Sequence, residues 1–228
     1  MDFNESKDNY RETIERTIAF AGKGLDFFTE VKADYLRKIV ASRLGETSVP
    51  KILDIGCGHG LMHPYLRSFG FDIVGAEVAR EVLPLAQAAN PDVLYVGYDG
   101  RRLPFASQSF DLALAVCVMH HVPPAEWKDF LGEMRRVLRS GGLAVVFEHN
   151  PLNPLTRYVV ASNAIDADAH LLSARTLRSL MRQAGFEAPL TRNILFTPFA
   201  HPGFRWLDDR LGRIPFGAQY YAIGTNNP

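Results

Sequence analysis

The chain has 228 residues, of which 47% are hydrophobic, and 25 basic and 25 acidic side chains give it a formal net charge of zero. This length and apolar content favour one globular domain over residues 1–228 and exclude a disordered chain. The balanced charge disfavours a nucleic-acid-binding protein, which normally uses a basic surface to contact phosphates.

The N-terminal segment is expected to be helical. Apolar residues recur at three- and four-residue steps between positions 6 and 45, and Gly22 and Gly24 divide the run into two helices. This helical cap, residues 1–45, carries Tyr10, Phe28 and Lys32. We expect these three side chains to bind substrate beneath a lid, with plain packing on the core as the alternative.

Strands and helices then alternate through a core that extends over residues 50–228. Apolar runs predict strands over 51–55, 71–77, 92–97, 109–118 and 142–149, and helices over 61–69, 81–89, 124–140 and 173–186. Such alternation predicts a doubly wound α/β sheet with helices on both faces. Two more strands, 187–196 and 217–224, are separated by about twenty residues and predict an antiparallel excursion at the sheet edge. The expected sheet has seven strands and is mostly parallel, with an antiparallel C-terminal strand.

A glycine-rich loop follows the first predicted strand. Residues 52–60 read ILDIGCGHG, and glycines there permit a tight turn and close approach of a ligand to the backbone. The dinucleotide fingerprint G-x-G-x-x-G requires a third glycine where this chain has Leu61. Asp54, two residues before Gly56, would repel a pyrophosphate but suits a ligand that carries an ammonium group.

Two further acids end the next two predicted strands. Glu77 is placed to accept hydrogen bonds from two ribose hydroxyls, while Asp99, followed by Gly100, suits an exocyclic amine and a ring nitrogen. The carboxyl ends of parallel strands meet in the crevice where such sheets bind ligands. For each acid taken alone, capping or turn chemistry is the alternative interpretation.

Four segments together resemble the class I S-adenosylmethionine-dependent methyltransferases, which have a Rossmann-like fold. ILDIGCGHG and VGAEVAREVLPLAQ resemble the first two motifs of that family. GYDGRRLPFASQSFDLALAVCVMHHV and EMRRVLRSGGLAVVFE resemble stretches of the small-molecule group that includes the ubiquinone and menaquinone methyltransferases. The resemblance covers about residues 50–150 densely. It implies S-adenosyl-L-methionine as the cofactor and a small molecule as the methyl acceptor.

The resemblance also implies a set of cofactor contacts. They run from the methionine end, through the ribose and adenine, to the sulfonium. In that order the residues are Asp54, Gly56, Cys57 and Gly58, then Glu77, then Val78, Asp99 and Gly100, and finally Val116 and Cys117.

Candidate bases and acceptor-binding residues follow the fourth and fifth strands. His120, His121 and His149 are candidate catalytic bases, because an ordinary histidine titrates near neutrality. For His121, support of the following helix is the alternative. Asn150 and Arg157 are candidate substrate-binding residues, with Asx-turns before the nearby prolines as the alternative. Adjacent histidine side chains are expected to diverge, so we expect no bound metal.

Three functions are compatible with these residues. Methyl transfer to a small-molecule acceptor is favoured, with oxygen preferred over carbon or nitrogen. A module that binds S-adenosylmethionine without catalysis is the second. A nicotinamide-dependent oxidoreductase is the third, and Leu61 argues against it.

The lengths of the apolar runs and the number of cysteines indicate where in the cell the protein is expected. The longest apolar run, 112–119, is far shorter than the roughly 20 residues that a membrane-spanning helix needs. The first ten residues are polar and acidic, unlike a signal peptide, and two cysteines make no disulfide framework. We therefore expect a cytoplasmic monomer or homodimer with no membrane and no nucleic-acid partner.

Overall fold

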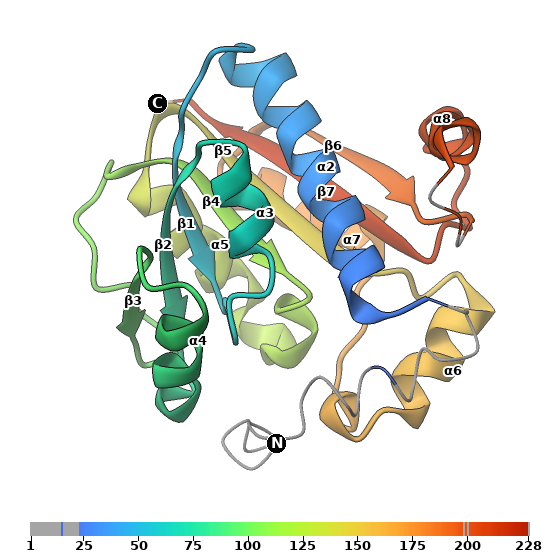
Figure 1. The fold of residues 1–228 in the computed structure, drawn as a ribbon, viewed down its shortest axis with the longest axis horizontal. Helices are drawn as coiled ribbons and strands as arrows, with labels where there is room; N and C mark the ends of the chain where they lie inside the picture. The colour runs from blue at the N-terminus through green and yellow to red at the C-terminus, as the bar shows by residue number, and fades with distance from the viewer. Residues whose placement is uncertain (1–14, 16–22, 198, 200, 228) are drawn as a thin grey trace.

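Seven strands form one sheet in the order β3-β2-β1-β4-β5-β7-β6 (Figure 1). The computed structural model describes residues 15, 23–197, 199 and 201–227. β7 runs antiparallel to both of its neighbours, β5 and β6, and the other pairings are parallel. The predicted fold class is therefore confirmed. The strands are β1 (Lys51–Ile55), β2 (Asp72–Glu77), β3 (Leu94–Gly97), β4 (Phe110–Val116), β5 (Leu138–His149), β6 (Glu187–Ile194) and β7 (Gln219–Asn226).

Helices cover both faces of the sheet. Helices α2 (Leu25–Leu44) and α3 (His63–Ser68) pack on the face that is turned toward the viewer in Figure 1. Helices α5 (Trp127–Val137) and α7 (Ala174–Gln183) pack on the opposite face. The central strand β4 contributes Leu112 and Leu114 to the first core and Ala113 and Ala115 to the second. It is apolar because a parallel strand between two helical layers is buried on both sides.

Local sequence signals account for the starts of several helices. Pro84 lies in the first turn of α4 (Leu83–Ala89), as expected, and a short 3-10 turn, η2 (Arg80–Val82), precedes it. Ser173 caps α7 by accepting a hydrogen bond from the backbone N–H of Thr176, also as expected. The described part of the N-terminal cap is α2, while Tyr10 and the helix expected before Gly22 lie outside the described residues.

The helix predicted over 124–140 ends earlier than expected. It comprises a 3-10 turn, η4 (Pro124–Glu126), and α5, which ends at Val137; β5 begins at the next residue. Leu138 pairs with Phe110, and the register then shifts before Leu112 pairs with Leu143. Gly141 and Gly142 therefore lie inside β5 rather than beyond a helix end. Pairing with β4 and burial of Leu138 outweigh the tendency of a glycine pair to end a helix.

The structure adds elements that the apolar pattern did not predict. They are η3 (Met119–His121), α6 (Pro154–Ser162), η5 (Ala164–Asp166) and α8 (Pro202–Leu211). Helix α6 has a recognisable start, because Asn153 caps the backbone N–H of Thr156 and Pro154 occupies the first turn. Both α6 and α8 lie at the end of the sheet where β5 and β6 end and β7 begins (Figure 1).

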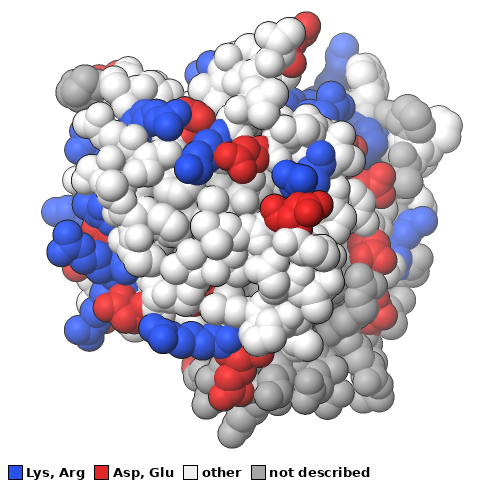
Figure 2. Space-filling view, turned by 60° about the vertical axis from the view of Figure 1, so that its left-hand side comes forward, with Lys and Arg blue, Asp and Glu red and all other residues white. Residues whose placement is uncertain are grey.

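The surface charge and the helix lengths relate to two expectations, that the protein binds no nucleic acid and spans no membrane. On the face shown in Figure 2, Lys and Arg are interspersed with Asp and Glu, so this face offers no basic stripe for phosphate contacts. Within the described part of the chain, every helix is too short or too polar to cross a membrane.

Asn150 fixes the chain where β5 ends. Its buried side-chain amide donates to the carbonyl oxygens of Pro215 and Gly217, at 2.9 and 2.8 Å. Its carbonyl oxygen accepts from the backbone N–H of Leu152 at 3.0 Å. These bonds tie the end of β5 to the loop before β7.

We expect Asn150→Ala to lower the free energy of unfolding by about 1–3 kcal/mol, because it leaves buried backbone groups without partners. Urea unfolding followed by circular dichroism measures the change. Leu152→Ala, in the same turn but with a side chain 55% exposed, serves as the control and should change stability by no more than about 0.5 kcal/mol. Equal stability of wild type and Asn150→Ala would contradict this structural role.

Candidate functional site

A cavity of about 850 Å³ lies across the carboxyl ends of the strands. All ten predicted cofactor residues, from Asp54 to Cys117, line it. The same cavity is lined by Phe28 and Lys32 of α2 and by the three predicted catalytic histidines. The structure thus brings together side chains from both halves of the chain around one space.

The glycine-rich loop forms the floor of one end of this cavity. Gly56 and Gly58 have φ angles of +71° and +51°, which are left-handed conformations that glycine adopts without strain. A Cβ atom at Gly56 would lie 2.7 Å from the side chain of Val118. The loop therefore requires glycine both for its turn and for its packing.

Asp54 carries a buried oxygen that is ready for a donor. Its Oδ2 lies 3.0 Å from Nε2 of His63, whose Nδ1 lies 2.6 Å from the hydroxyl of Tyr95. Its Oδ1 is buried and has no hydrogen-bond partner within the described structure. A buried carboxylate oxygen without a donor is costly, so this position fits a ligand ammonium group. Sequence reasoning missed His63 and Tyr95, which hold the carboxylate in place.

Glu77 organises the backbone around the next part of the cavity. Its Oε2 accepts from the backbone N–H of Gly58 at 2.8 Å, and its Oε1 accepts from those of Val78 and Ala79 at 2.7 and 2.9 Å. Glu77 thus links the glycine loop to the end of β2. Each carboxylate oxygen has further lone pairs for hydroxyl donors.

Val78 and Asp99 lie at the far side of this end. Val78 is an apolar side chain that is 42% exposed, so the cavity presents an uncovered apolar surface there. Asp99 is exposed, and its Oδ1 accepts from the backbone N–H groups of Arg102 and Arg101. These bonds lower the pKa of Asp99. Turn chemistry accounts for one of its oxygens, while the residue still lines the cavity.

A buried charge network closes the opposite end. Nδ1 of His120 lies 2.7 Å from Oε2 of Glu148, and its Nε2 lies 3.4 Å from Oδ1 of Asp166. Oε1 of Glu148 also accepts from the backbone N–H of Met119 at 2.7 Å. One imidazole therefore bridges two carboxylates, from β5 and from η5.

This network separates the charge states of the three histidines. Burial disfavours a charge on His120, but the attraction of Glu148 and Asp166 is stronger and raises its pKa to about 10. Burial, followed by repulsion from His120, lowers the pKa values of His121 and His149 to about 4. At neutral pH, His120 is a cation and the other two histidines are neutral.

His120 and His121 do not diverge as the sequence argument assumed. They lie in the 3-10 turn η3, their ring centroids are 4.1 Å apart, and Nε2 of His121 is 3.5 Å from the Asp166 oxygen that His120 approaches. One potential metal-ligand atom from each of His120, His121 and Asp166 lies within 4.8 Å of the other two. The absence of a metal stays a prediction, but the reason given for it was wrong.

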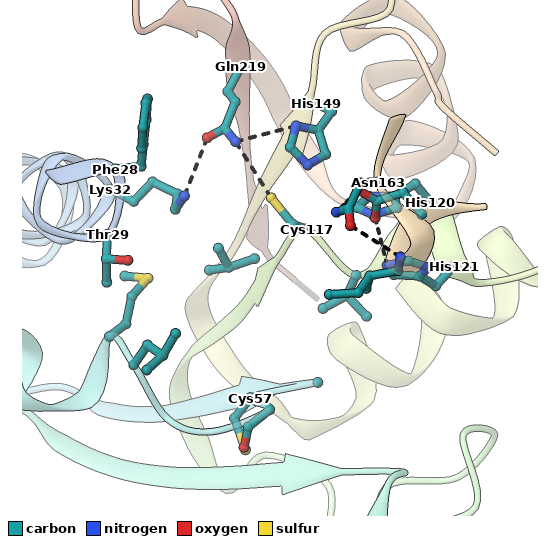
Figure 3. A pocket seen from close by; sticks show the side chains of 18 of the residues that line it. Phe28, Thr29, Lys32, Cys57, Cys117, His120, His121, His149, Asn163 and Gln219 are labelled. Atoms are coloured by element: carbon teal, nitrogen blue, oxygen red, sulfur yellow. Dashed lines mark hydrogen bonds and ion pairs between the residues drawn. The ribbon is translucent and has the colours of Figure 1, made fainter. Parts of the chain in front are cut away.

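A second chain of polar groups crosses the cavity from α2 to β5 (Figure 3). Nζ of Lys32 lies 3.5 Å from Oε1 of Gln219, whose Nε2 lies 3.4 Å from Nδ1 of His149. The same amide nitrogen lies 3.8 Å from Sγ of Cys117. An ammonium group can only donate, so Lys32 fixes which end of the Gln219 amide carries the oxygen.

That orientation determines the tautomer of His149. Because the Gln219 amide nitrogen faces Nδ1, this ring atom accepts the hydrogen bond, and the neutral ring carries its proton on Nε2. His149 thus offers a donor at Nε2 rather than a proton acceptor.

Two predicted substrate-binding residues lie away from the cavity. Asn150 uses its side chain in the turn described above, and Arg157 is an exposed residue of α6. Neither lines the cavity, and Tyr10 lies outside the described residues. For Asn150, the alternative of an Asx-turn agrees with the geometry.

Comparison with known proteins gives consistent relatives. A family described as a methyltransferase domain matches residues 53–146. An uncharacterised methyltransferase of Synechocystis is 32% identical over 60% of this chain and 66% of its own length. A ubiquinone biosynthesis O-methyltransferase of Roseobacter denitrificans is 29% identical over 66% and 65%. The chain thus spans slightly less than two thirds of the length of these relatives.

Solved structures share the fold. A Thermotoga maritima protein described as an S-adenosylmethionine-dependent methyltransferase, possibly a histamine N-methyltransferase, superposes with a TM-score of 0.71. The two sequences are 22% identical, and the match covers 99% of this chain and 98% of that one. The domain match identifies a methyltransferase domain over residues 53–146, and the curated relatives, the shared fold and the glycine loop beside an unpartnered carboxylate support a class I S-adenosylmethionine-dependent methyltransferase.

Proposed function

We propose that this protein transfers a methyl group from S-adenosylmethionine to an oxygen atom of a small-molecule acceptor. The observation that carries the proposal is a single cavity with two chemically different ends. One end has the glycine loop and three carboxylates, and the other has the histidine network and Lys32. Cofactor and acceptor would therefore meet near Cys117, between the two ends.

The residues at the first end fit the cofactor. Oδ1 of Asp54 would accept from the ammonium of the methionine portion, and Glu77 would accept from the ribose hydroxyls. The exposed side chain of Val78 would pack on the adenine, with Asp99 at its edge. When bound, S-adenosylmethionine supplies an electrophilic methyl group on a positively charged sulfur.

At the second end, the protein's contribution is positioning and exclusion of water. His120 is held as a cation between two carboxylates, and His149 offers an N–H donor. His121 is the remaining candidate for a proton acceptor, because its lowered pKa leaves it neutral. Positioning of the acceptor oxygen in line with the sulfur–methyl bond contributes several orders of magnitude in rate.

The acceptor atom is a separate part of the proposal. The named relatives include O-methyltransferases, and one structural neighbour is described as a possible N-methyltransferase. A screen of phenols, quinones, carboxylic acids, sugars and amines, read out by product mass and by the NMR shift of the new methyl group, distinguishes oxygen, nitrogen and carbon products.

We expect S-adenosylmethionine and S-adenosylhomocysteine to raise the melting temperature, because a ligand that binds only the native state stabilises it. Differential scanning fluorimetry measures the shift, with nicotinamide dinucleotides as the comparison. A shift with the dinucleotides alone would contradict the proposal. Cofactor binding without methyl transfer to any acceptor of the screen would favour a non-catalytic binding module.

We expect Glu77→Ala to weaken binding of S-adenosylhomocysteine at least about tenfold, since hydrogen bonds to a charged acceptor are worth about 1.5–3 kcal/mol each. Isothermal titration calorimetry provides the dissociation constant. Asp72→Ala, at the exposed start of the same strand, is the matched control and should bind like wild type. Unchanged affinity in Glu77→Ala would mean that its carboxylate serves only the backbone.

The raised pKa of His120 predicts a pH dependence of stability. Its folded-state pKa of about 10 exceeds an ordinary value near 6.5. The stabilisation is therefore fully present below about pH 6.5 and is lost as the pH rises through 10. In urea titrations between pH 6 and 10.5, wild type should lose more stability than His120→Gln. His170→Gln, at an exposed site, should follow wild type; parallel curves for wild type and His120→Gln would contradict the charge assignment.

A further inference from the structure

Lys32 is a buried cation at the acceptor end of the cavity. It lies in the middle of α2, and only 7% of it is exposed. Figure 3 shows its side chain extending from α2 toward Gln219 and Cys117. Burial lowers its pKa, which reflects the cost of keeping an ammonium group away from water.

The hydrogen bonds of Lys32 are incomplete. An ammonium group has three N–H donors, and among the described residues the hydrogen bond of Lys32 is the one to the Gln219 side-chain oxygen, at 3.5 Å. Among the residues that the structure describes, no carboxylate forms an ion pair with Lys32. A neutral amide at this distance does not compensate a buried positive charge.

Four carboxylates of the cavity are engaged elsewhere. Glu148 and Asp166 both contact His120, so that their negative charges are directed to another cation. Asp54 and Glu77 are held at the cofactor end by His63 and by the backbone of the glycine loop. Among the residues that the structure describes, none of these four carboxylates neutralises Lys32, and a bound anion would supply its counter-charge.

Neighbouring groups would receive the same molecule. The Gln219 amide, whose oxygen contacts the Lys32 ammonium, sets His149 to offer an N–H at Nε2. Leu25 and Phe28 also line the cavity and precede Lys32 by seven and four residues on the same face of α2. Donors for an oxygen anion thus lie next to an apolar wall.

We propose that Lys32 binds the anionic oxygen of the methyl acceptor, and that this acceptor is a carboxylate or phenolate attached to an apolar body. The inference rests on the proposed function and names its substrate class. An anionic oxygen is attracted both to the ammonium group and to the sulfonium, so it lies between two positive charges. A neutral acceptor would leave those two charges repelling each other.

The charges and electrons balance without a base. A lone pair of the acceptor oxygen forms the O–CH3 bond while the S–CH3 bond breaks and its electron pair stays on sulfur. The anion becomes a neutral ester or ether, and the sulfonium becomes a neutral thioether. No proton is removed in this step, which agrees with a His149 that carries its proton on Nε2 and with a protonated His120.

The experiment measures binding to the complex with S-adenosylhomocysteine, by calorimetry at pH 8. Three pairs of probes differ in charge at one position: cinnamate and cinnamamide, decanoate and decanamide, and 4-nitrophenolate and 4-nitroanisole. The first two pairs report on carboxylates and the third on phenolates. We expect at least one anion to bind at least about tenfold more tightly than its neutral counterpart, as a charge-assisted hydrogen bond provides.

Three variants test whether the preference for the anion depends on Lys32. Lys32→Met should reduce the ratio of anion to neutral affinity to near one, while Lys32→Arg, which keeps a permanent charge, should retain a preference for the anion. Lys38→Met is the matched control, because Lys38 lies on the same helix but forms an ion pair with Asp209 at 2.8 Å outside this cavity. All variants should bind S-adenosylhomocysteine within about twofold of wild type, which also shows that they are folded.

The outcomes separate this inference from the proposed function. Equal affinity for charged and neutral probes, or an unchanged preference in Lys32→Met, overturns the assignment of Lys32. Failure of every anion to bind at millimolar concentration, in a protein that binds S-adenosylhomocysteine, overturns it as well. Loss of S-adenosylhomocysteine binding by wild type would instead contradict the proposed function.

Discussion

Burial of both faces of the sheet is the constraint on which the site depends. The side chains of β1 and β4 alternate between two helical layers, so these strands carry apolar residues on both faces. Polar groups can therefore be concentrated only where strands end. Asp54, near the end of β1, and Glu77, at the end of β2, occur at this edge, and the glycine loop keeps the space above them open.

The cavity keeps its charges apart along its length. Within the described part of the chain, its cofactor end is acidic and contains a carboxylate oxygen without a donor, while its acceptor end contains a cation without a counter-charge. At the acceptor end, His120 and its two carboxylates form a closed network of their own. Because the two ends do not neutralise each other, each retains the capacity to bind a ligand group of the opposite charge.

Sequence patterns predicted those parts of the site that are determined by residues close together in the chain. Apolar runs indicated the five parallel strands, and the acids that follow three of them lie in one cavity as expected. The sequence could not reveal that Asp166 meets His120, because η5 reaches this end of the cavity only through the path of α6. Nor could it reveal the closeness of His120 and His121, since an extended backbone separates adjacent side chains whereas a 3-10 turn brings them to one side.

Gln219 illustrates how strand direction adds a residue that no motif indicates. In a parallel strand the first residue lies at the edge opposite the site, so a glutamine at a strand start would normally be unrelated to the ligand. β7 runs in the opposite direction, and its first residue, Gln219, is paired with His149, the last residue of β5. The reversal therefore brings a start-of-strand amide to the same edge as the carboxyl ends of β4 and β5. From there it contacts Lys32, which is 187 positions away in the chain, and sets the tautomer of His149. A strand that joins the sheet in the opposite sense is thus the physical reason why an amide from a strand start lies between Lys32 and His149 at the acceptor end.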